Sequence, residues 1–302
     1  MEFKISDKLT LMLTEQGFTY SNWLYINDDV KAVIETGMDE VGLNGLNPES
    51  IDLVINSHHH LDHTRGNNLF SRSKVMIHEL EKDVLKTENL FISYNSLDLW
   101  DELMPGVDVW EAFEEVGFRG YSRDYKPFDY SREVIPLQDG QILDFGHVKA
   151  EVLHLPGHSV GHCCFWFPEE ELLFSSDICM TKAGPWYGEH LADPIEMMRS
   201  IDRIIELNPP RMVSSHIHEV LDDPIPCLLE FKSRIEKREE RIYKYLLANP
   251  SDIHSLASAN LVYRAHPTNY VVFWEKLMLE KHIERLSAQG RVKESNGIYY
   301  GE

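Results

Sequence analysis

The segment HHHLDH places four histidines and one aspartate within six positions. Imidazole nitrogens and carboxylate oxygens are ligands that zinc, iron and manganese accept. His58 and His60 alternate on an extended segment, so both side chains can face one side while His59 faces the other. Asp62 and His63 follow at the turn into a predicted helix. The alternative is an ordinary polar loop, since such loops also collect histidine and aspartate. A metal site is favoured because one ion needs three or four ligands, and this turn alone offers four.

Three more residues of the same chemical types follow apolar runs later in the chain. His158 lies in LPGHSVGH after the run EVLHL, Asp177 ends LLFSSD, and His216 ends MVSSH. Short apolar runs bounded by turn residues are typical of buried strands. Donors at strand ends can gather along one edge, so we expect these three residues to lie near HHHLDH and to supply a second metal ion.

The elements that must position these donors are mostly strands. Residues 18–35 predict two strands joined by a turn, and residues 51–56 predict the buried strand that leads into HHHLDH. Asp193, followed by a proline, predicts the start of a helix that ends at about Leu207. The other predicted strands are KVMIHE, QILDFG, VKAEVLHL, HCCFWF, ELLFSSD and PRMVSSH.

Residues 85–135 form a long segment between two predicted strands, and ten of them are aromatic. Trp110 and Phe113 lie on one face of a predicted helix that Gly117 would end. A connection of this length inside a compact domain is often functional. We therefore predict a helical insertion that supplies one apolar wall of a substrate pocket, with the loop after Asp177 opposite. The predicted pocket residues are Phe91, Tyr94, Tyr121, Trp186 and Tyr187.

From residue 226 onward the predicted elements are mainly helices instead of strands. This change predicts a catalytic domain at 1–225 and a C-terminal module at 226–302. A charged amphipathic helix at 227–248 is followed by a helix capped at Ser251 or Asp252, by a third helix at 270–288, and by a hairpin turning at Asn296-Gly297. Three helices and a hairpin predict a winged-helix-like module. We expect it to serve dimerisation or closure of the pocket, with nucleic-acid binding as the alternative.

The net charge of −21 is unevenly distributed. The module holds 12 lysines and arginines against 10 acids, whereas the preceding residues hold 17 against 40. So acidic a body repels polyanions, and the small positive balance of the module is weak for binding DNA. Charge therefore favours a small-molecule substrate over nucleic acid.

The 302 residues are 43% hydrophobic, which is ordinary for a globular chain that buries a sizeable core. No stretch reaches the roughly 18 apolar residues of a membrane span, and the start MEFKISDKLTLML does not resemble a signal peptide. The cysteines (Cys163, Cys164, Cys179 and Cys227) show no regular spacing, which favours reduced thiols. We expect a cytoplasmic protein without a membrane partner, and leave a homodimer open.

The order H-x-H-x-D-H, Gly-His, Asp and a final His resembles the metallo-β-lactamase superfamily over residues of about 18–220. The resemblance implies an α/β fold, an αββα sandwich, and two metal ions. By this resemblance His58, His60 and His158 hold the first ion. Asp62, His63 and His216 hold the second, and Asp177 bridges the two.

Three positions depart from the family pattern without removing a ligand. Ser176 stands where the family often has glycine before the bridging aspartate. An early Asp-Thr-Gly appears as Glu35-Thr36-Gly37, and the last histidine is flanked by Ser215 and Ile217 instead of two glycines. These departures separate the chain from the best-known branches of the superfamily and leave the substrate open.

A site of this kind implies metal-assisted hydrolysis, in which two ions share a hydroxide that attacks a carbonyl or phosphorus centre. Asp62 would orient the hydroxide or pass on its proton, and Asp177 would join the ions. The donor types do not separate zinc, iron and manganese; we expect zinc, with iron or manganese as alternatives. Glyoxalase II-like thioesterases and lactonases keep all seven ligands, so we expect hydrolysis of a thioester or other activated ester. The alternatives are an endoribonuclease or phosphodiesterase, a mononuclear-iron persulfide dioxygenase, and a non-catalytic regulator.

Overall fold

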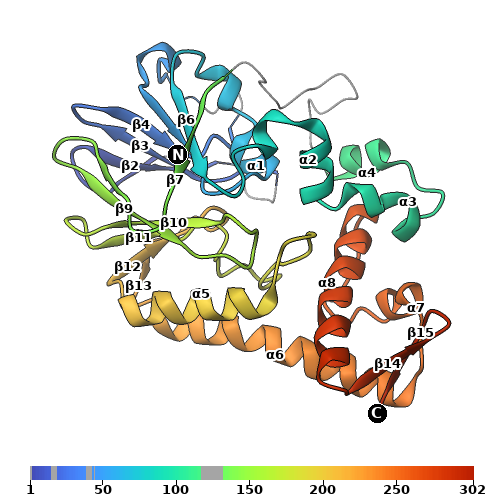
Figure 1. The fold of residues 1–302 in the computed structure, drawn as a ribbon. Helices are drawn as coiled ribbons and strands as arrows, with labels where there is room; N and C mark the ends of the chain where they lie inside the picture. The colour runs from blue at the N-terminus through green and yellow to red at the C-terminus, as the bar shows by residue number, and fades with distance from the viewer. Residues whose placement is uncertain (1, 15–18, 39–42, 44, 117–131) are drawn as a thin grey trace.

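Two β-sheets lie face to face with helices outside them, as the resemblance predicts (Figure 1). The computed structural model describes residues 2–14, 19–38, 43, 45–116 and 132–302. The expectation of an α/β sandwich is confirmed.

The first sheet has the order β1-β2-β3-β4-β5-β6-β7. Neighbouring strands from β1 through β4 pair antiparallel, and neighbouring strands from β4 through β7 pair parallel. The strands are β1 Glu2–Lys4, β2 Leu9–Met12, β3 Trp23–Asn27, β4 Lys31–Ile34, β5 Leu53–Ile55, β6 Lys74–His78 and β7 Val134–Leu137.

The second sheet has the order β13-β12-β11-β10-β9-β8. Only the β11–β12 pair is parallel in the described part of this sheet, because helix α5 (Pro194–Leu207) crosses between those two strands. The strands are β8 Ile142–Asp144, β9 Lys149–His154, β10 Cys163–Phe167, β11 Leu172–Phe174, β12 Arg211–Val213 and β13 Leu221–Asp222.

The space between the sheets is the main apolar core. Leu9 and Leu11 of β2 pack in the same buried cluster as Phe165 and Phe167 of β10. Their spacing of two residues puts both members of each pair on the same face of a strand. Burial of apolar surface on this scale, at about 25 cal/mol per Å², is the main force holding the sheets together.

Helices cover the outer faces. Asp193 caps α5 by accepting hydrogen bonds from the amides of Ile195 and Glu196, which confirms the predicted start. Figure 1 shows α5 and α6 beneath the second sheet, where Met197 and Ile201 of α5 enter a buried cluster with Phe231 of α6. The helical elements of the sandwich are η2 Pro48–Ser50, α1 Leu61–Thr64, η3 Asn67–Leu69 and α5 Pro194–Leu207.

The aromatic insertion is helical where the structure describes it. Phe91, Trp100 and Phe113 form a core with Tyr270 and Phe273 of α8, so the insertion rests on the C-terminal helices. Tyr121 and Gly117 lie outside the described residues. The elements are η4 Val84–Lys86, α2 Glu88–Tyr94, η5 Leu97–Leu99, α3 Trp100–Leu103 and α4 Val109–Glu115.

The C-terminal elements occur in the predicted order. Asn296 and Gly297 have φ of +54° and +75°, as a two-residue hairpin turn requires. In Figure 1, α8 runs from the hairpin to the insertion. The elements are α6 Ile225–Ala248, α7 Ile253–Ser258, α8 Asn269–Ala288, β14 Val292–Ser295 and β15 Ile298–Gly301. The winged-helix assignment and the boundary at residue 226 stay predictions. In the described ranges, none of the helices has the length and apolar character to cross a membrane.

Candidate metal centre

Loops at strand ends carry the candidate ligands. HHHLDH follows β5 and runs into α1, and His158 lies in the loop after β9. Asp177 and His216 follow β11 and β12, which are parallel neighbours and therefore end at the same edge. The fold brings all seven predicted residues into two adjoining groups.

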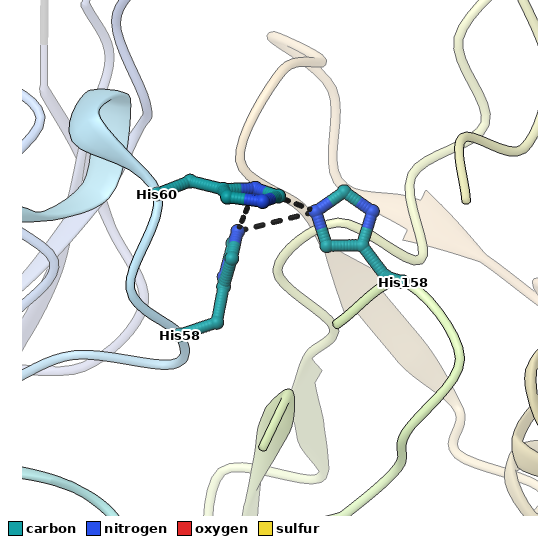
Figure 2. A group of neighbouring side chains, drawn as sticks. All are labelled: His58, His60 and His158. Atoms are coloured by element: carbon teal, nitrogen blue, oxygen red, sulfur yellow. Dashed lines mark hydrogen bonds between the residues drawn. The ribbon is translucent and has the colours of Figure 1, made fainter. Parts of the chain in front are cut away.

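The first group consists of three imidazole nitrogens that face one another (Figure 2). His58 Nε2 lies 2.8 Å from His60 Nδ1. His158 Nε2 lies 3.2 Å from His58 Nε2 and 3.1 Å from His60 Nδ1. A tetrahedral ion with bonds of about 2.0 Å separates its ligands by about 3.3 Å. The spacing therefore matches three corners of a metal site.

The second group contains Asp62, His63, Asp177 and His216. His63 Nε2 lies 3.2 Å from Asp177 Oδ1 and 3.4 Å from Asp62 Oδ2. His216 Nε2 lies 3.3 Å from each of the same two oxygens. The other oxygen of Asp177, Oδ2, lies 3.4 Å from His158 Nε2 of the first group. One carboxylate thus faces both groups.

Two buried glutamates orient ligand rings from behind. Glu189 Oε2 lies 2.7 Å from His60 Nε2, so Nδ1 of that ring is left for the first group. Glu35 Oε2 lies 3.2 Å from His63 Nδ1, so Nε2 of that ring is left for the second group. Outer carboxylates of this kind commonly fix the tautomer of metal-binding histidines.

Backbone and hydroxyl groups orient the remaining rings of the first group. The His158 ring donates from Nδ1 to the backbone carbonyl of Trp186 at 3.1 Å. His58 Nδ1 lies 2.8 Å from the Ser57 hydroxyl. Each imidazole of the first group therefore has one nitrogen held by a neighbour and the other turned inward.

Glu81 joins the two ligand-bearing loops. Its carboxylate accepts hydrogen bonds from the His59 amide at 2.8 Å, the Ser159 hydroxyl at 2.6 Å and the Gly161 amide at 2.7 Å. The His59 ring lies between two carboxylates, with Nδ1 3.1 Å from Glu81 and Nε2 3.4 Å from Glu189. His59 therefore faces away from the first group, as predicted, but into a buried acidic environment.

Ser176 has a left-handed backbone with φ of +47°, a conformation that favours glycine. Its hydroxyl lies 2.7 Å from that of Ser57 and 3.3 Å from that of Ser215, so it links the ends of β5, β11 and β12. These hydrogen bonds offset the strain, which is about 1–2 kcal/mol. The next amide, that of Asp177, donates to His162 Nε2 at 3.2 Å, which holds the shared aspartate from behind.

The two groups differ electrostatically. Burial lowers the pKa of His60 and that of His158 to about 3, so these imidazoles are neutral and keep a lone pair for a cation. Burial also works against the charged form of His216, but the Asp177 carboxylate outweighs it and raises the pKa of His216 to about 10. The second group thus balances its carboxylates with protons when no cation is bound.

The donor set fits two divalent cations. Among the described residues, Asp177 Oδ1 and His63 Nε2 are buried without a hydrogen-bond partner, although buried polar atoms normally have one. Three inward-facing nitrogens at about 3 Å also repel one another unless a proton or a cation lies between them. A cation in each group would satisfy these atoms.

The predicted pocket residues occupy different environments. Trp186 is half-buried, and its ring centroid lies 5.1 Å from those of His60 and His158. Tyr94 lies 5.6 Å from the His59 ring, and Phe91 is buried in the core of the insertion. Tyr187 has no exposed surface, so it does not line a solvent-accessible pocket in this structure. The Tyr187 hydroxyl lies 2.8 Å from His282 Nε2 of α8, so this ring faces the C-terminal helices.

The sequence model of the Metallo-beta-lactamase superfamily matches residues 16–216. A Bos taurus acyl-coenzyme A thioesterase, MBLAC2, is 26% identical over 183 residues, or 54% of this chain and 60% of that protein. A Mus musculus hydroxyacylglutathione hydrolase-like protein is 24% identical over 218 residues, or 70% of this chain and 58% of that protein. The matches thus span about three fifths of each relative.

The fold extends beyond the part that the family model covers. A metallo-beta-lactamase family protein from Thermus thermophilus superposes with a TM-score of 0.74 at 19% identity, covering 99% of this chain and 100% of its own. The C-terminal helices and hairpin therefore belong to a shared architecture. With a family match over 16–216 and a sandwich that gathers the motif residues, the chain belongs to the metallo-beta-lactamase superfamily.

Proposed function

We propose that this superfamily hydrolase uses two divalent metal ions to hydrolyse a thioester or other activated ester of a small molecule. The observation that carries the proposal is the Asp177 carboxylate, which has one oxygen toward each donor group. A site for a single ion would have no use for the second group.

The first ion would be held by His58, His60 and His158, and the second by Asp62, His63 and His216, with Asp177 shared. Bound divalent cations supply Lewis acidity that polarises a carbonyl oxygen and lowers the pKa of water from about 16 toward 7. Zinc, iron and manganese all accept nitrogen and carboxylate donors, and we propose zinc as the metal.

Residues of the chain would orient the reacting groups and handle the proton. The Asp62 side chain keeps 12% of its surface exposed, so part of it is accessible to solvent. We propose that an Asp62 oxygen accepts the proton of the attacking water. Glu189 and Glu35 would keep the rings of His60 and His63 in the required tautomers.

An aromatic row beside the first group supports an apolar acyl substrate. The ring centroids of Trp186 and Trp274 lie 5.6 Å apart. Behind Trp274, Tyr270 and Phe113 belong to the buried core of the insertion, with centroid separations of 4.9 Å for Trp274–Tyr270 and 5.0 Å for Tyr270–Phe113. Trp186 and Trp274 are half-buried, so part of each residue remains accessible. Ligand pockets are commonly lined by aromatic side chains with few polar groups. One relative is named an acyl-coenzyme A thioesterase and the other a hydroxyacylglutathione hydrolase-like protein, which agrees with this proposal.

The test is a substrate panel with the metal-loaded protein: acyl thioesters of increasing chain length, lactones, a phosphodiester and single-stranded RNA. We expect thioester turnover whose KM falls as the acyl chain lengthens. Trp186→Ala should raise that KM several-fold without changing metal content, and Trp166→Ala on β10 is the matched control. Faster cleavage of RNA or the phosphodiester, abolished in Asp62→Ala, would replace this proposal with a nuclease.

A further inference from the structure

The loop between Asp177 and α5 touches two rings of the first histidine group. Its Trp186 carbonyl accepts the hydrogen bond of His158 Nδ1, and its Glu189 carboxylate lies 2.7 Å from His60 Nε2. The position of this loop therefore sets which ring nitrogen of His60 and of His158 faces the first group. Residues 178–192, all of which the structure describes, form no helix or strand that would hold the loop.

Helix α6 of the C-terminal module binds the first half of this loop. Arg238 is 3% exposed and donates from Nη2 to the carbonyl of Ala183 at 2.6 Å and from Nη1 to that of Pro185. Its Nη1 also donates to the Tyr187 hydroxyl at 3.3 Å. The φ of Gly184, +84°, favours glycine, and a Cβ at this position would lie 2.9 Å from Arg238 Nη2, so a side chain here would force the guanidinium to shift.

A second arginine of α6 continues this attachment. Arg234, one turn before Arg238, donates from Nη1 to the carbonyls of Thr181 and Lys182 at 3.0 and 3.2 Å. Successive carbonyls of an irregular loop thus find their donors on one face of a helix. Guanidinium groups suit this task because each offers several donors in a fixed geometry.

Helix α8 holds the second half of the loop. His282 Nε2 lies 2.8 Å from the Tyr187 hydroxyl, and Lys281 donates to the carbonyl of His190 at 2.8 Å. These contacts lie on either side of Glu189. The loop is therefore attached to α6 before Glu189 and to α8 on both sides of it.

We propose that the C-terminal module positions the first histidine group by holding residues 181–190, with Arg238 as the principal positioning residue. This inference rests on the proposed two-ion site and extends it. The module is then a working part of the metal centre, because the loop that orients His60 and His158 depends on donors from α6 and α8. Loss of groups that orient metal ligands typically weakens metal binding about 10–100-fold.

The experiment compares Arg238→Gln with Arg241→Gln in the full chain. Arg241 lies on the same helix and donates to the carbonyl of Leu261 at 2.7 Å, within the module and away from the loop. Stepwise zinc dissociation constants come from competition with a chromophoric chelator, and the melting temperature is measured on metal-free protein. The d–d spectrum of the cobalt-loaded protein reports the ligand geometry.

We expect Arg238→Gln to weaken one of the two zinc-binding steps about 10–100-fold and to alter the cobalt spectrum, while the other step changes little. Arg241→Gln should leave both steps within about threefold of wild type. Tyr187→Phe, which removes only a hydroxyl that contacts His282 and Arg238, should shift the same step in the same direction by less. This second variant keeps the test decisive if Arg238→Gln does not fold.

Zinc binding by Arg238→Gln or Tyr187→Phe equal to that of wild type would overturn the inference. So would equal weakening of both steps, accompanied by the same loss in Arg241→Gln, because that pattern reports general destabilisation. Failure of the wild-type chain to bind two ions would instead overturn the proposed function, so the two failures are distinguishable.

Discussion

Glu81→Gln removes a buried negative charge while keeping the size of the side chain. Glu81 is completely buried and accepts hydrogen bonds from the His59 amide, the Ser159 hydroxyl and the Gly161 amide. Glutamine offers one acceptor oxygen and one NH₂ group. Whichever way the amide turns, its NH₂ faces a buried backbone N–H, of His59 in one orientation and of Gly161 in the other.

The expected loss of stability follows from these contacts. A hydrogen bond to a charged group contributes about 1.5–3 kcal/mol, and a buried donor left without a partner costs a similar amount. Charge-assisted bonds are about twice as strong as neutral ones, so the two that survive are also weakened. We therefore expect Glu81→Gln to lower the free energy of unfolding by about 3–5 kcal/mol, which corresponds to a melting temperature lower by on the order of 5–15 °C.

The assay is urea denaturation of metal-free protein in the presence of a chelator, so that lost metal affinity does not contribute. Glu79→Gln is the matched control, because Glu79 is 56% exposed and its ion pair with Lys82 spans 3.9 Å. Exposed pairs contribute about 0–1 kcal/mol. Equal stabilities of the Glu81 and Glu79 variants would refute the view that the Glu81 carboxylate holds the two ligand loops together.

Three further changes have defined outcomes. Asp177→Asn should release both ions in elemental analysis, because each group loses a carboxylate oxygen; retention of two ions would show that Asp177 is not shared. His59→Ala should lower the free energy of unfolding by about 3–5 kcal/mol in urea titrations, since it leaves Glu81 buried without its imidazole partner; a loss below about 1 kcal/mol would contradict this. Burial and the ring of His154, stacked at 3.9 Å, lower the pKa of His78 to about 4. The unfolded chain takes up that proton near pH 6.5, so the free energy of unfolding falls as the pH drops from about 6.5 to 4. His60 and His158 contribute to the same slope in metal-free protein, so His78→Gln should reduce the slope without abolishing it, and an unchanged slope would refute the assignment.

Local chemistry made much of the architecture predictable from the sequence. The Asp193 cap lies next to the amides it serves, and Asn296-Gly297 is itself the turn, so neighbouring residues contain the whole signal. The seven metal-type residues could be picked out because they lie in four segments that each follow an apolar strand. Ser176 departs from the family pattern in the sequence, but its link to Ser57 and Ser215 appears only in three dimensions.

The supporting residues could not be predicted in the same way, because their partners are distant in the sequence. Glu81 accepts from residues 22, 78 and 80 positions away, and Glu189 contacts His60 across 129 positions. Isolated acids in loops give no local sign of such contacts. The position of Tyr187 could not be predicted for the same reason. It is next to Trp186 in the sequence, but it is completely buried and its hydroxyl contacts His282, 95 positions later.

The central claim is that the chain holds two metal ions through one shared carboxylate. Elemental analysis of the purified protein, after removal of metal and reconstitution with excess zinc followed by desalting, tests it most directly. We predict two equivalents per wild-type chain. A value of one equivalent that does not rise with further zinc would contradict the two-ion site.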